Sequence, residues 1–190
     1  MIRNLLFELR YLLRDTPWDT QISPPELIEF LETSPPGHAL DLGCGTGTNA
    51  LTINSYSWDV IGVDSSFLAI RRAEEKARVQ AAQVKFYKLD VSRLRGITGK
   101  FDLILDIGCY HSLSLKARAS YIQRIAQLIH PAGTYLLYTW LADPDETQLR
   151  PPSTQEIQQA FSPHFAAITQ QLGTEQGRTS AWYRMQVHPA

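Results

Sequence analysis

The sequence predicts a doubly wound α/β fold: a mostly parallel seven-stranded sheet with helices on both faces and one antiparallel strand near the C-terminus. Two observations predict it. From residue 38 onward, strand-like and helix-like segments alternate, which is typical of βαβ units and a parallel sheet. Only a short turn region, 173–177, separates the last two strand-like segments. Because a parallel crossover needs a dozen or more residues, these two strands pair antiparallel.

Residues 1–34 are expected to form a helical segment outside the sheet. Apolar residues recur at helical spacing through "MIRNLLFELRYLLRD", at Ile2, Leu5, Leu6, Leu9, Leu12 and Leu13. Charged residues interrupt this stretch, so it predicts an amphipathic helix rather than the core of a signal peptide. A turn-rich connector, Asp15 to Pro25, carries Trp18 and leads into a second expected helix, Glu26 to Glu32.

The alternating segments are recognised by apolar periodicity and by residues that cap helices. The expected strands are 38–41, 58–64, 84–90, 101–107, 134–140, 165–171 and 180–187. One helix is expected at 46–56, and three more begin after Ser65 or Ser66, after Ser114, and at the capping box of Ser153 and Glu156. In the helix after Ser66, the apolar residues sharing one face are Phe67, Ile70, Ala73 and Ala77. In the helix after Ser114 they are Tyr121, Ile125, Leu128 and Ile129.

Composition and charge limit the classes of protein to which this chain can belong. The 190 residues are 44% apolar and 19% charged, which predicts one ordinary globular domain, 1–190, with a sheet core at 35–190. A net charge of −1 and the lack of a basic block give no support to nucleic-acid binding. Apolar runs are too short to span a bilayer, so a soluble cytoplasmic protein is expected. Cys44 and Cys109 lack the spacing of a zinc site, and no metal is expected. The oligomeric state stays open.

A glycine-rich stretch, "LDLGCGTGTN", follows the first expected strand. Glycine at Gly43, Gly45 and Gly47 indicates a loop where the backbone comes close to a ligand. The dinucleotide fingerprint GxGxxG would place its third glycine at Thr48, and the phosphate-binding GxxxxGK[ST] pattern is missing. The glycine spacing therefore favours a sulfonium cofactor over a dinucleotide or a phosphate.

Acidic residues stand at or near the ends of four expected strands, at Asp41, Asp64, Asp90 and Asp106. In open α/β sheets, ligands bind beyond the carboxyl ends of the strands. Carboxylates there repel the phosphates of a dinucleotide or a nucleoside triphosphate. S-adenosylmethionine carries a sulfonium and an ammonium against one carboxylate and has no phosphate. An acidic rim thus favours S-adenosylmethionine as the cofactor.

The stretches "ALDLGCGTG", "VIGVDSS", "VKFYKLDV", "FDLILDIGCYH" and "HPAGTYLLYTW" resemble the successive motifs of class I S-adenosylmethionine-dependent methyltransferases, which have a Rossmann-like fold. The resemblance runs from about Pro35 to Trp140. The opening "PWDTQISPPELIEF" resembles the start of the small-molecule members, namely the thiopurine, tellurite-resistance and thiol methyltransferases. Those proteins usually have glycine soon after the Trp-Asp pair, where this chain has Gln21.

The resemblance implies a set of cofactor-binding residues. By this resemblance, the methionine part of the cofactor is held by Asp41 and the backbone of Gly43, Cys44, Gly45 and Gly47, and its amino group is bordered by Asp106 and Ile107. The ribose hydroxyls would donate to Asp64, and the adenine would lie along Ser65. The adenine amino group would be bound by Asp90 and the backbone of Val91.

Few residues are candidates for the acceptor side. Tyr110 and His111 follow the fourth strand, where His111 is either a general base or substrate orienter, or a loop residue that caps the next helix. In small-molecule relatives the N-terminal segment folds over the cofactor, which makes Tyr11 and Trp18 residues of a lid or of simple packing. Trp140, with Tyr138, either walls an apolar acceptor pocket or belongs to the core.

The expected function is methyl transfer from S-adenosylmethionine to a small-molecule acceptor, leaving S-adenosylhomocysteine. The place after the fourth strand reads Asp106-Ile107-Gly108-Cys109 instead of the [DN]PP[YFW] motif of enzymes that methylate nucleic-acid bases. No large substrate domain is inserted. The alternatives are methylation of a protein or RNA, and a non-catalytic domain that binds S-adenosylmethionine.

Overall fold

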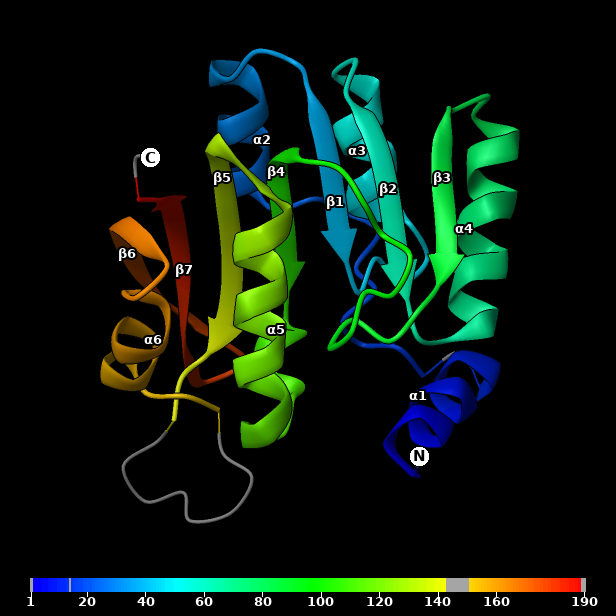
Figure 1. The fold of residues 1–190 in the computed structure, drawn as a ribbon. Helices are drawn as coiled ribbons and strands as arrows, with labels where there is room; N and C mark the ends of the chain where they lie inside the picture. Colours follow the sequence, from blue (N-terminus) through cyan, green and yellow to red (C-terminus); the bar gives the residue numbers. More distant parts are fainter. Residues whose placement is uncertain (1, 14, 143–150, 189–190) are drawn as a thin grey trace. The chain divides into compact units, whose positions relative to one another are not determined.

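The computed structural model describes residues 2–13, 15–142 and 151–188, with side chains from residue 8 onward except at 167 (Figure 1). The side chains of Ile2, Leu5 and Leu6, which contribute to the predicted apolar face of the first helix, therefore lie outside the described part. The chain divides into two compact units, 1–91 and 92–190. The single domain predicted above stays a prediction. No helix in the described ranges is long and apolar enough to cross a membrane.

The first unit contains three parallel strands in the order β3-β2-β1. Its strands are β1 (His38–Leu42), β2 (Asp59–Asp64) and β3 (Val84–Lys88). Its helices are α1 (Ile2–Leu13), α2 (Pro25–Thr33), α3 (Thr48–Ser55) and α4 (Phe67–Val79). The strands are largely apolar and β1 is buried along all but its first residue, as expected for strands covered by helices.

The second unit contains four strands in the order β4-β5-β7-β6. Its strands are β4 (Phe101–Ile107), β5 (Ile129–Trp140), β6 (Phe165–Glu175) and β7 (Arg178–Val187). Its helices are the 3-10 turn η1 (Tyr110–Ser112), α5 (Leu115–Leu128) and α6 (Thr154–Phe161). In Figure 1, α5 lies in front of β4 and β5. Of the predicted apolar face of this helix, Tyr121, Ile125 and Leu128 are buried on α5, whereas Ile129 is the first residue of β5 and not part of the helix.

Strand β7 is the reversed strand that the sequence predicts. It pairs antiparallel with both β5 and β6, whereas β4 and β5 are parallel. The turn between β6 and β7 consists of Gln176 and Gly177, with φ of 51° and 77°. Two consecutive residues with positive φ are typical of the type I′ turn, whose twist matches that of a two-stranded hairpin. The predicted fold class is confirmed.

The predicted helix caps are also confirmed. Ser66, rather than Ser65, accepts a hydrogen bond of 3.0 Å from the amide of Ala69 at the start of α4. Ser114 caps α5 in the same way, and Ser153 and Glu156 form a complete capping box at α6. Side-chain oxygens at these positions satisfy amides that have no partner within the helix.

Two details of the prediction are wrong. Strand β5 begins at Ile129, directly after α5, and not at Thr134. Its register against β4 jumps between Phe101 and Leu103, so a bulge accommodates the exposed residues 130–132. Phe67 is 51% exposed and does not share the buried face of α4, because it is the first residue of that helix and lies beside solvent-exposed cationic side chains.

Candidate cofactor and acceptor site

The glycine loop after β1 has a backbone that favours glycine at three positions. Gly43, Gly45 and Gly47 have φ of 68°, 53° and 85°, in the left-handed region that L side chains avoid. A Cβ atom on Gly47 would lie 2.9 Å from Cβ of Ala73 and 3.0 Å from Cζ of Phe86. The loop is therefore pressed against α4 and β3, and a side chain at Gly47 cannot be accommodated without displacement of its neighbours.

Hydrogen bonds tie the same loop to the end of β2. The amides of Gly43 and Cys44 donate to the carbonyl of Val63, at 2.7 and 3.0 Å. The amide of Gly45 donates to Oδ2 of Asp64 at 3.0 Å. The loop after β1 and the acid at the end of β2 are thus fixed relative to each other before any ligand is bound.

Asp64 is held by three backbone amides. Besides Gly45, the amide of Ser66 donates to Oδ1 at 2.7 Å, and the amide of Ser65 also bonds to the carboxylate. Burial raises the pKa of Asp64, and these bonds oppose the rise because they stabilise the charged form. A carboxylate has about four lone-pair sites, so one remains for a further donor.

The other acidic residues predicted in this unit differ in exposure. The side chain of Asp41, on β1, is only 2% exposed, whereas Asp90 is exposed and Val91 beside it is buried. The amide of Leu89 donates to the carbonyl of Asp64 at 2.8 Å, which holds the segment after β3 beside the end of β2. Asp64 is intermediate in exposure between these two acids.

Helix α1 is docked on α4 through Glu8. Its carboxylate accepts hydrogen bonds from the Ser66 hydroxyl at 2.9 Å and from the amides of Phe67 and Leu68 at 2.5 and 3.3 Å. These amides belong to the first turn of α4 and have no intrahelical partner. A negative charge there also interacts favourably with the helix dipole. The contact of Glu8 was not predicted, because 58 positions separate it from Ser66 and leave no local sequence signal.

The predicted lid residues Tyr11 and Trp18 lie together. Tyr11 is 3% exposed, and its hydroxyl would lie 3.0 Å from a Cβ atom on Gly45, so it packs directly against the glycine loop. The indole of Trp18 donates to that hydroxyl at 3.3 Å and is 42% exposed. Arg72 of α4 donates to the carbonyl of Tyr11 at 2.7 Å. Burial raises the pKa of Tyr11, which therefore stays a neutral phenol at the loop.

A polar network joins the N-terminal connector to the glycine loop. Thr46, in the loop, donates to Asp19 at 2.8 Å and accepts from Lys76 of α4 at 2.6 Å. Gln21 bonds to Asp19, to Lys76 and, at 3.5 Å, to Thr46. Gln21 has φ of 61°. The backbone is therefore left-handed at the position where the resembling proteins usually have glycine, and the side chain of Gln21 is bonded to Asp19 and Lys76.

In the second unit, Asp106 is completely buried at the end of β4. Its carboxylate accepts from the amides of Cys109 and Tyr110, at 2.7 and 3.1 Å, and from the hydroxyls of Tyr121 and Tyr135. Burial raises the pKa of Asp106 to about 7 although these donors lower it. The carboxylate thus organises turn η1 from within. Because this carboxylate is enclosed, it is not a candidate to contact the methionine amino group. The backbone of Asp106 and Ile107 remains a candidate for that contact.

The imidazole of His111, in η1, is held against the end of β5. Its Nδ1 lies 3.3 Å from the amide nitrogen of Trp140, which donates to it, and 3.3 Å from the hydroxyl of Thr139. The ring stacks on the Trp140 indole, with centroids 5.1 Å apart and planes 11° apart. Arg118 of α5 donates to the His111 carbonyl at 3.0 Å. His111 is therefore a positioned side chain, whereas Tyr110 is buried and packs on Tyr121.

Two side chains lie against the Trp140 indole. The His111 ring stacks on it, and the guanidinium of Arg178 lies 5.2 Å from the ring centroid. The indole nitrogen donates to Glu175 at 3.0 Å, and Glu175 also accepts from the Tyr138 hydroxyl, whose pKa burial raises to about 12. Trp140 is thus the stacking partner of His111, and its role as a wall of an acceptor pocket stays a prediction. Glu175 and Arg178, from the β6–β7 hairpin, were not predicted because the hairpin turn reaches this place only in three dimensions.

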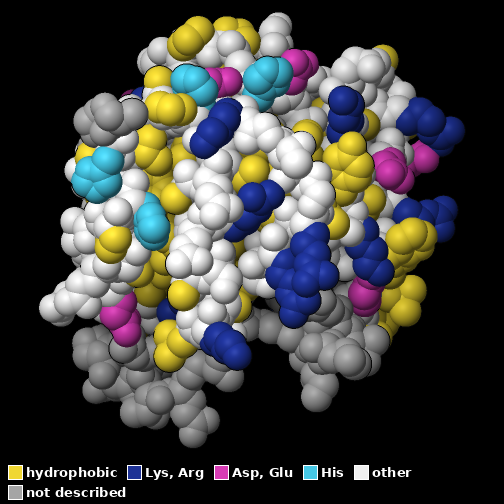
Figure 2. Space-filling model, viewed as in Figure 1, with side chains coloured by type: hydrophobic (Ala, Val, Ile, Leu, Met, Phe, Trp, Pro, Cys, Tyr) yellow, Lys and Arg dark blue, Asp and Glu magenta, His cyan; other side chains and the backbone are white. Residues whose placement is uncertain are grey.

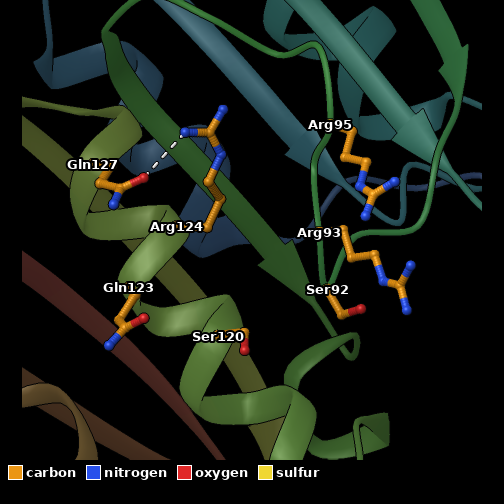
Figure 3. A pocket seen from close by; sticks show the side chains of 7 residues that line it. All are labelled: Ser92, Arg93, Arg95, Ser120, Gln123, Arg124 and Gln127. Atoms are coloured by element: carbon orange, nitrogen blue, oxygen red, sulfur yellow. Dashed lines mark hydrogen bonds between the residues drawn. The ribbon is translucent and has the colours of Figure 1, made fainter.

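A polar groove on the second unit lies outside this arrangement. It has a volume of about 310 Å³ and is lined by Ser92, Arg93, Arg95, Ser120, Gln123, Arg124 and Gln127. Figure 2 shows basic side chains gathered on the face that carries α5. In Figure 3, Arg93 and Arg95 extend away from α5, and the guanidinium of Arg124 is bonded to the Gln127 side chain and the Ile97 carbonyl. These groups do not converge on one point, so the groove is not the site of the chemistry.

Comparison with known proteins decides the family. Residues 39–133, half of the chain, match the protein family described as a methyltransferase domain. The chain belongs to the methyltransferase family. A "probable thiol methyltransferase 2" of Arabidopsis thaliana is 32% identical over 162 residues, covering 81% of this chain and 70% of that protein. An uncharacterized methyltransferase of Schizosaccharomyces pombe is 33% identical over 100 residues, covering 53% of this chain and 69% of its own.

Solved structures of other proteins share the fold of this chain over nearly its whole length. A 1,6-didemethyltoxoflavin-N1-methyltransferase of Burkholderia thailandensis, solved with its acceptor and S-adenosylhomocysteine, has a TM-score of 0.80 at 19% identity. The similarity covers 98% of this chain and 88% of that one. The predicted Rossmann-like fold is confirmed, and the protein is an S-adenosylmethionine-dependent methyltransferase.

The residues of the first unit fit this cofactor. Three glycines open the loop to close backbone approach, and a Cβ atom on Gly45 would meet the Tyr11 hydroxyl. Asp64 presents a carboxylate that ribose hydroxyls recognise by donating to it. The first unit also lacks the GxxxxGK[ST] sequence that cradles phosphates, in agreement with a cofactor that has none.

Proposed function

We propose that this methyltransferase transfers the methyl group of S-adenosylmethionine to a small-molecule acceptor by in-line displacement. The observation that carries the proposal is the preorganised end of β4 and β5, where His111 is fixed by Trp140, Thr139 and Arg118. Groups fixed in advance lower the entropic cost of orienting a reactant. The named relatives support a small acceptor, because they include a thiol methyltransferase, a hydroxyquinolone methyltransferase and a didemethyltoxoflavin methyltransferase.

The roles proposed for the first unit follow its geometry. Asp41 and the backbone of Gly43, Cys44, Gly45 and Gly47 hold the methionine part of the cofactor. Asp64 accepts a ribose hydroxyl at its remaining lone-pair site, and Ser65 lies along the adenine. Asp90 and the backbone of Val91 receive the adenine amino group. When bound, S-adenosylmethionine supplies an electrophile that is already activated, so the protein has to orient the acceptor and exclude water.

The segment 1–34 is proposed to act as a lid. Its contacts support this role, because Glu8 caps α4 and Tyr11 packs on Gly45. Trp18 donates to Tyr11 and lies under the guanidinium of Arg10, 5.3 Å from its ring centroid, while remaining partly exposed. Such a segment excludes water from a bound cofactor and retains it. We also propose a cytoplasmic location, since neither Cys44 nor Cys109 forms a disulfide.

The proposal is tested by release of S-adenosylhomocysteine with a panel of thiols, phenols, carboxylic acids, halides and metalloid oxyanions. We expect at least one class to be methylated, with severalfold less product when Asp64 is replaced by alanine at a cofactor concentration near the wild-type Kd. Tight cofactor binding without turnover on any member of the panel would contradict the proposal. Methylation only of protein or RNA would contradict its small-molecule part.

A further inference from the structure

Strand β6 lies at the outer edge of the second unit, beyond β7 (Figure 1). Among the described residues it pairs with β7 alone, so one side of its backbone has no partner strand. Proteins usually protect an edge strand by keeping it short or by placing lysine, proline or a bulge in it. Strand β6 has 11 residues, and its stretch from Ile168 to Thr174 contains no charged residue, no proline and no register shift. This edge is therefore unprotected.

The edge strand of the first unit is different. Strand β3 has 5 residues, and two of them, Lys85 and Lys88, are exposed lysines. A short strand with charged side chains is a poor template for another strand, because its contacts are few and its charges have to be desolvated. The contrast indicates that the β6 edge, unlike the β3 edge, is suited to pairing.

The hairpin register determines which residues of β6 point away from β7. Glu175 and Arg178 flank the two-residue turn and form the first pair. In a two-residue hairpin this pair exchanges both backbone hydrogen bonds, and every second pair after it does the same. The β6 residues of the intervening pairs direct their backbone N–H and C=O groups outward. We call them the edge row: Ile168, Gln170, Leu172 and Thr174.

Two hydrogen bonds agree with this direction. The carbonyl of Thr179 accepts from the amide of Leu141, which follows β5, at 2.9 Å. Thr179 therefore faces β5, and Thr174, which lies opposite it on β6, faces outward. The carbonyl of Arg184 accepts from the hydroxyl of Thr169 at 3.4 Å, so Arg184 faces β6. The edge row thus presents alternating backbone donors and acceptors at the edge.

We propose that the edge row is a self-association surface, on which a second copy of this chain adds its own β6 antiparallel to form one continuous sheet. A two-fold axis at Gln171 gives every member of the row a partner. Ile168 then lies opposite Thr174 of the second copy, and Gln170 lies opposite Leu172. Each such pair exchanges two backbone hydrogen bonds. An axis moved to a neighbouring residue leaves either Ile168 or Thr174 without a partner.

The side chains of the row favour a second copy over a strand of another protein. They carry no charge, so two identical rows do not repel each other. Leu172 is 65% exposed in one copy, and pairing places it beside the aliphatic stem of Gln170 of the second copy. A strand of another protein would be selected through pockets for its alternate side chains. The polar groove of this unit is lined from α5 and residues 92–95 and not from β6.

Sedimentation velocity over a concentration series tests the pairing. We expect the wild-type mass to rise to twice the mass of one chain. Gln171 lies on the two-fold axis opposite its own copy, so Gln171→Lys brings two like charges to about 5 Å from each other. This variant should dimerise at least tenfold more weakly. Gln80→Lys, at the exposed end of α4, is the matched control and should dimerise like the wild type.

Two results of this comparison would overturn the proposal. One is a wild-type protein that stays monomeric at every concentration. The other is a Gln171→Lys dimer as tight as that of the wild type, which would place the interface elsewhere.

An equal mixture of Gln171→Lys and Gln171→Glu separates charge repulsion from misfolding. Each variant alone has like charges at the axis, whereas the mixed pair has opposite charges there. We expect mixed dimers that are tighter than those of either variant alone by tenfold or more. Lack of mixed dimers, when both variants keep the circular dichroism of the wild type, would overturn the proposal.

Amide hydrogen exchange followed by NMR resolves the individual residues of β6. The amides of Gln170 and Leu172 should be protected in the wild-type dimer and exchange faster in Gln171→Lys. The amides of residue 171 and Gly173 face β7 in this register and should stay protected in both proteins. None of these measurements uses a methyl acceptor, so their outcome is independent of the proposed function. Unprotected amides at Gln170 and Leu172 in the wild-type dimer would overturn the proposal.

Discussion

The amide of Gly45 donates a hydrogen bond of 3.0 Å to Oδ2 of Asp64, joining the loop after β1 to the acid at the end of β2. The two residues are 19 positions apart in sequence. This bond aligns the loop proposed to approach the cofactor with the carboxylate proposed to bind its ribose. In this proposal, a single carboxylate both organises the loop and binds the ligand.

Replacing Asp64 with alanine should weaken S-adenosylhomocysteine binding by about 10- to 150-fold. One charge-assisted hydrogen bond is worth about 1.5–3 kcal/mol, and about 1.4 kcal/mol corresponds to a factor of ten. Calorimetry measures the change. Asp59→Ala, at the exposed start of the same strand, is the matched control and should leave affinity unchanged. Equal affinity of Asp64→Ala and wild type would show that Asp64 does not touch the cofactor.

Replacing Gly47 with alanine should destabilise the protein by more than the same change at Gly99. Both glycines have positive φ, 85° and 97°, so each alanine adds about 1–2 kcal/mol of backbone strain. Only Gly47 has neighbours, Ala73 and Phe86, that its new Cβ would meet, whereas nothing lies within 4 Å at Gly99. Overpacking adds about 1–3 kcal/mol at Gly47. Urea unfolding of the two variants measures the difference, and equal losses would mean that the loop is not tightly packed.

Replacing Glu8 with alanine should loosen α1 from α4. The change leaves the amides of Phe67 and Leu68 and the hydroxyl of Ser66 without their acceptor. Hydrogen exchange in residues 2–13 should become faster, and S-adenosylhomocysteine should dissociate sooner, while the strands keep their protection. Glu29→Ala on α2 is the control, because its side chain is exposed there. Hydrogen exchange in α1 that stays as slow as in the wild type would show that Glu8 does not hold α1 on α4.

Replacing Tyr121 with phenylalanine should make stability more dependent on pH. Burial raises the pKa of Asp106 to about 7 in the folded protein, from an ordinary value near 3.8. The folded state then binds the proton more tightly than the unfolded state, so the stability linked to Asp106 is full below about pH 4 and is lost as pH rises through about 7.

The Tyr121 hydroxyl stabilises the carboxylate, so its removal should raise this pKa further. We expect a loss of about 1.5–3 kcal/mol at pH 8.5 and a smaller loss at pH 5, measured by urea unfolding at both values. Tyr135→Phe, whose hydroxyl is 3.5 Å from the same carboxylate, is the control and should have a weaker effect. A loss in Tyr121→Phe that is the same at both pH values would contradict the role of Asp106.

The local features of this fold could be predicted from the sequence. Strand alternation, the capping serines and the hairpin depend on residues within a few positions of each other, and the structure confirms them. The glycine loop is of the same kind, because Gly43, Gly45 and Gly47 owe their role to local backbone geometry.

The contacts that depend on distant residues could not be predicted. The sequence predicts Asp106 as an acid at the carboxyl end of a strand, where ligands bind. In the structure its carboxylate is enclosed by Tyr121 and Tyr135, which are 15 and 29 positions away. Glu8 reaches Ser66 across 58 positions, and Glu175 reaches Trp140 across 35. Gln21 lies between these two cases. Its own residue type does not predict a left-handed backbone, but the glycine that the resembling proteins usually have at this place does.

Transfer of a labelled methyl group distinguishes a small-molecule acceptor from a macromolecular one. The purified protein is incubated with S-adenosylmethionine carrying a tritiated methyl group and a whole-cell extract, which is then divided by size into a small-molecule and a macromolecular fraction. We expect label in the small-molecule fraction, reduced severalfold with Asp64→Ala at limiting cofactor. Label confined to protein or RNA, or no transfer by a protein that binds S-adenosylhomocysteine, would contradict it.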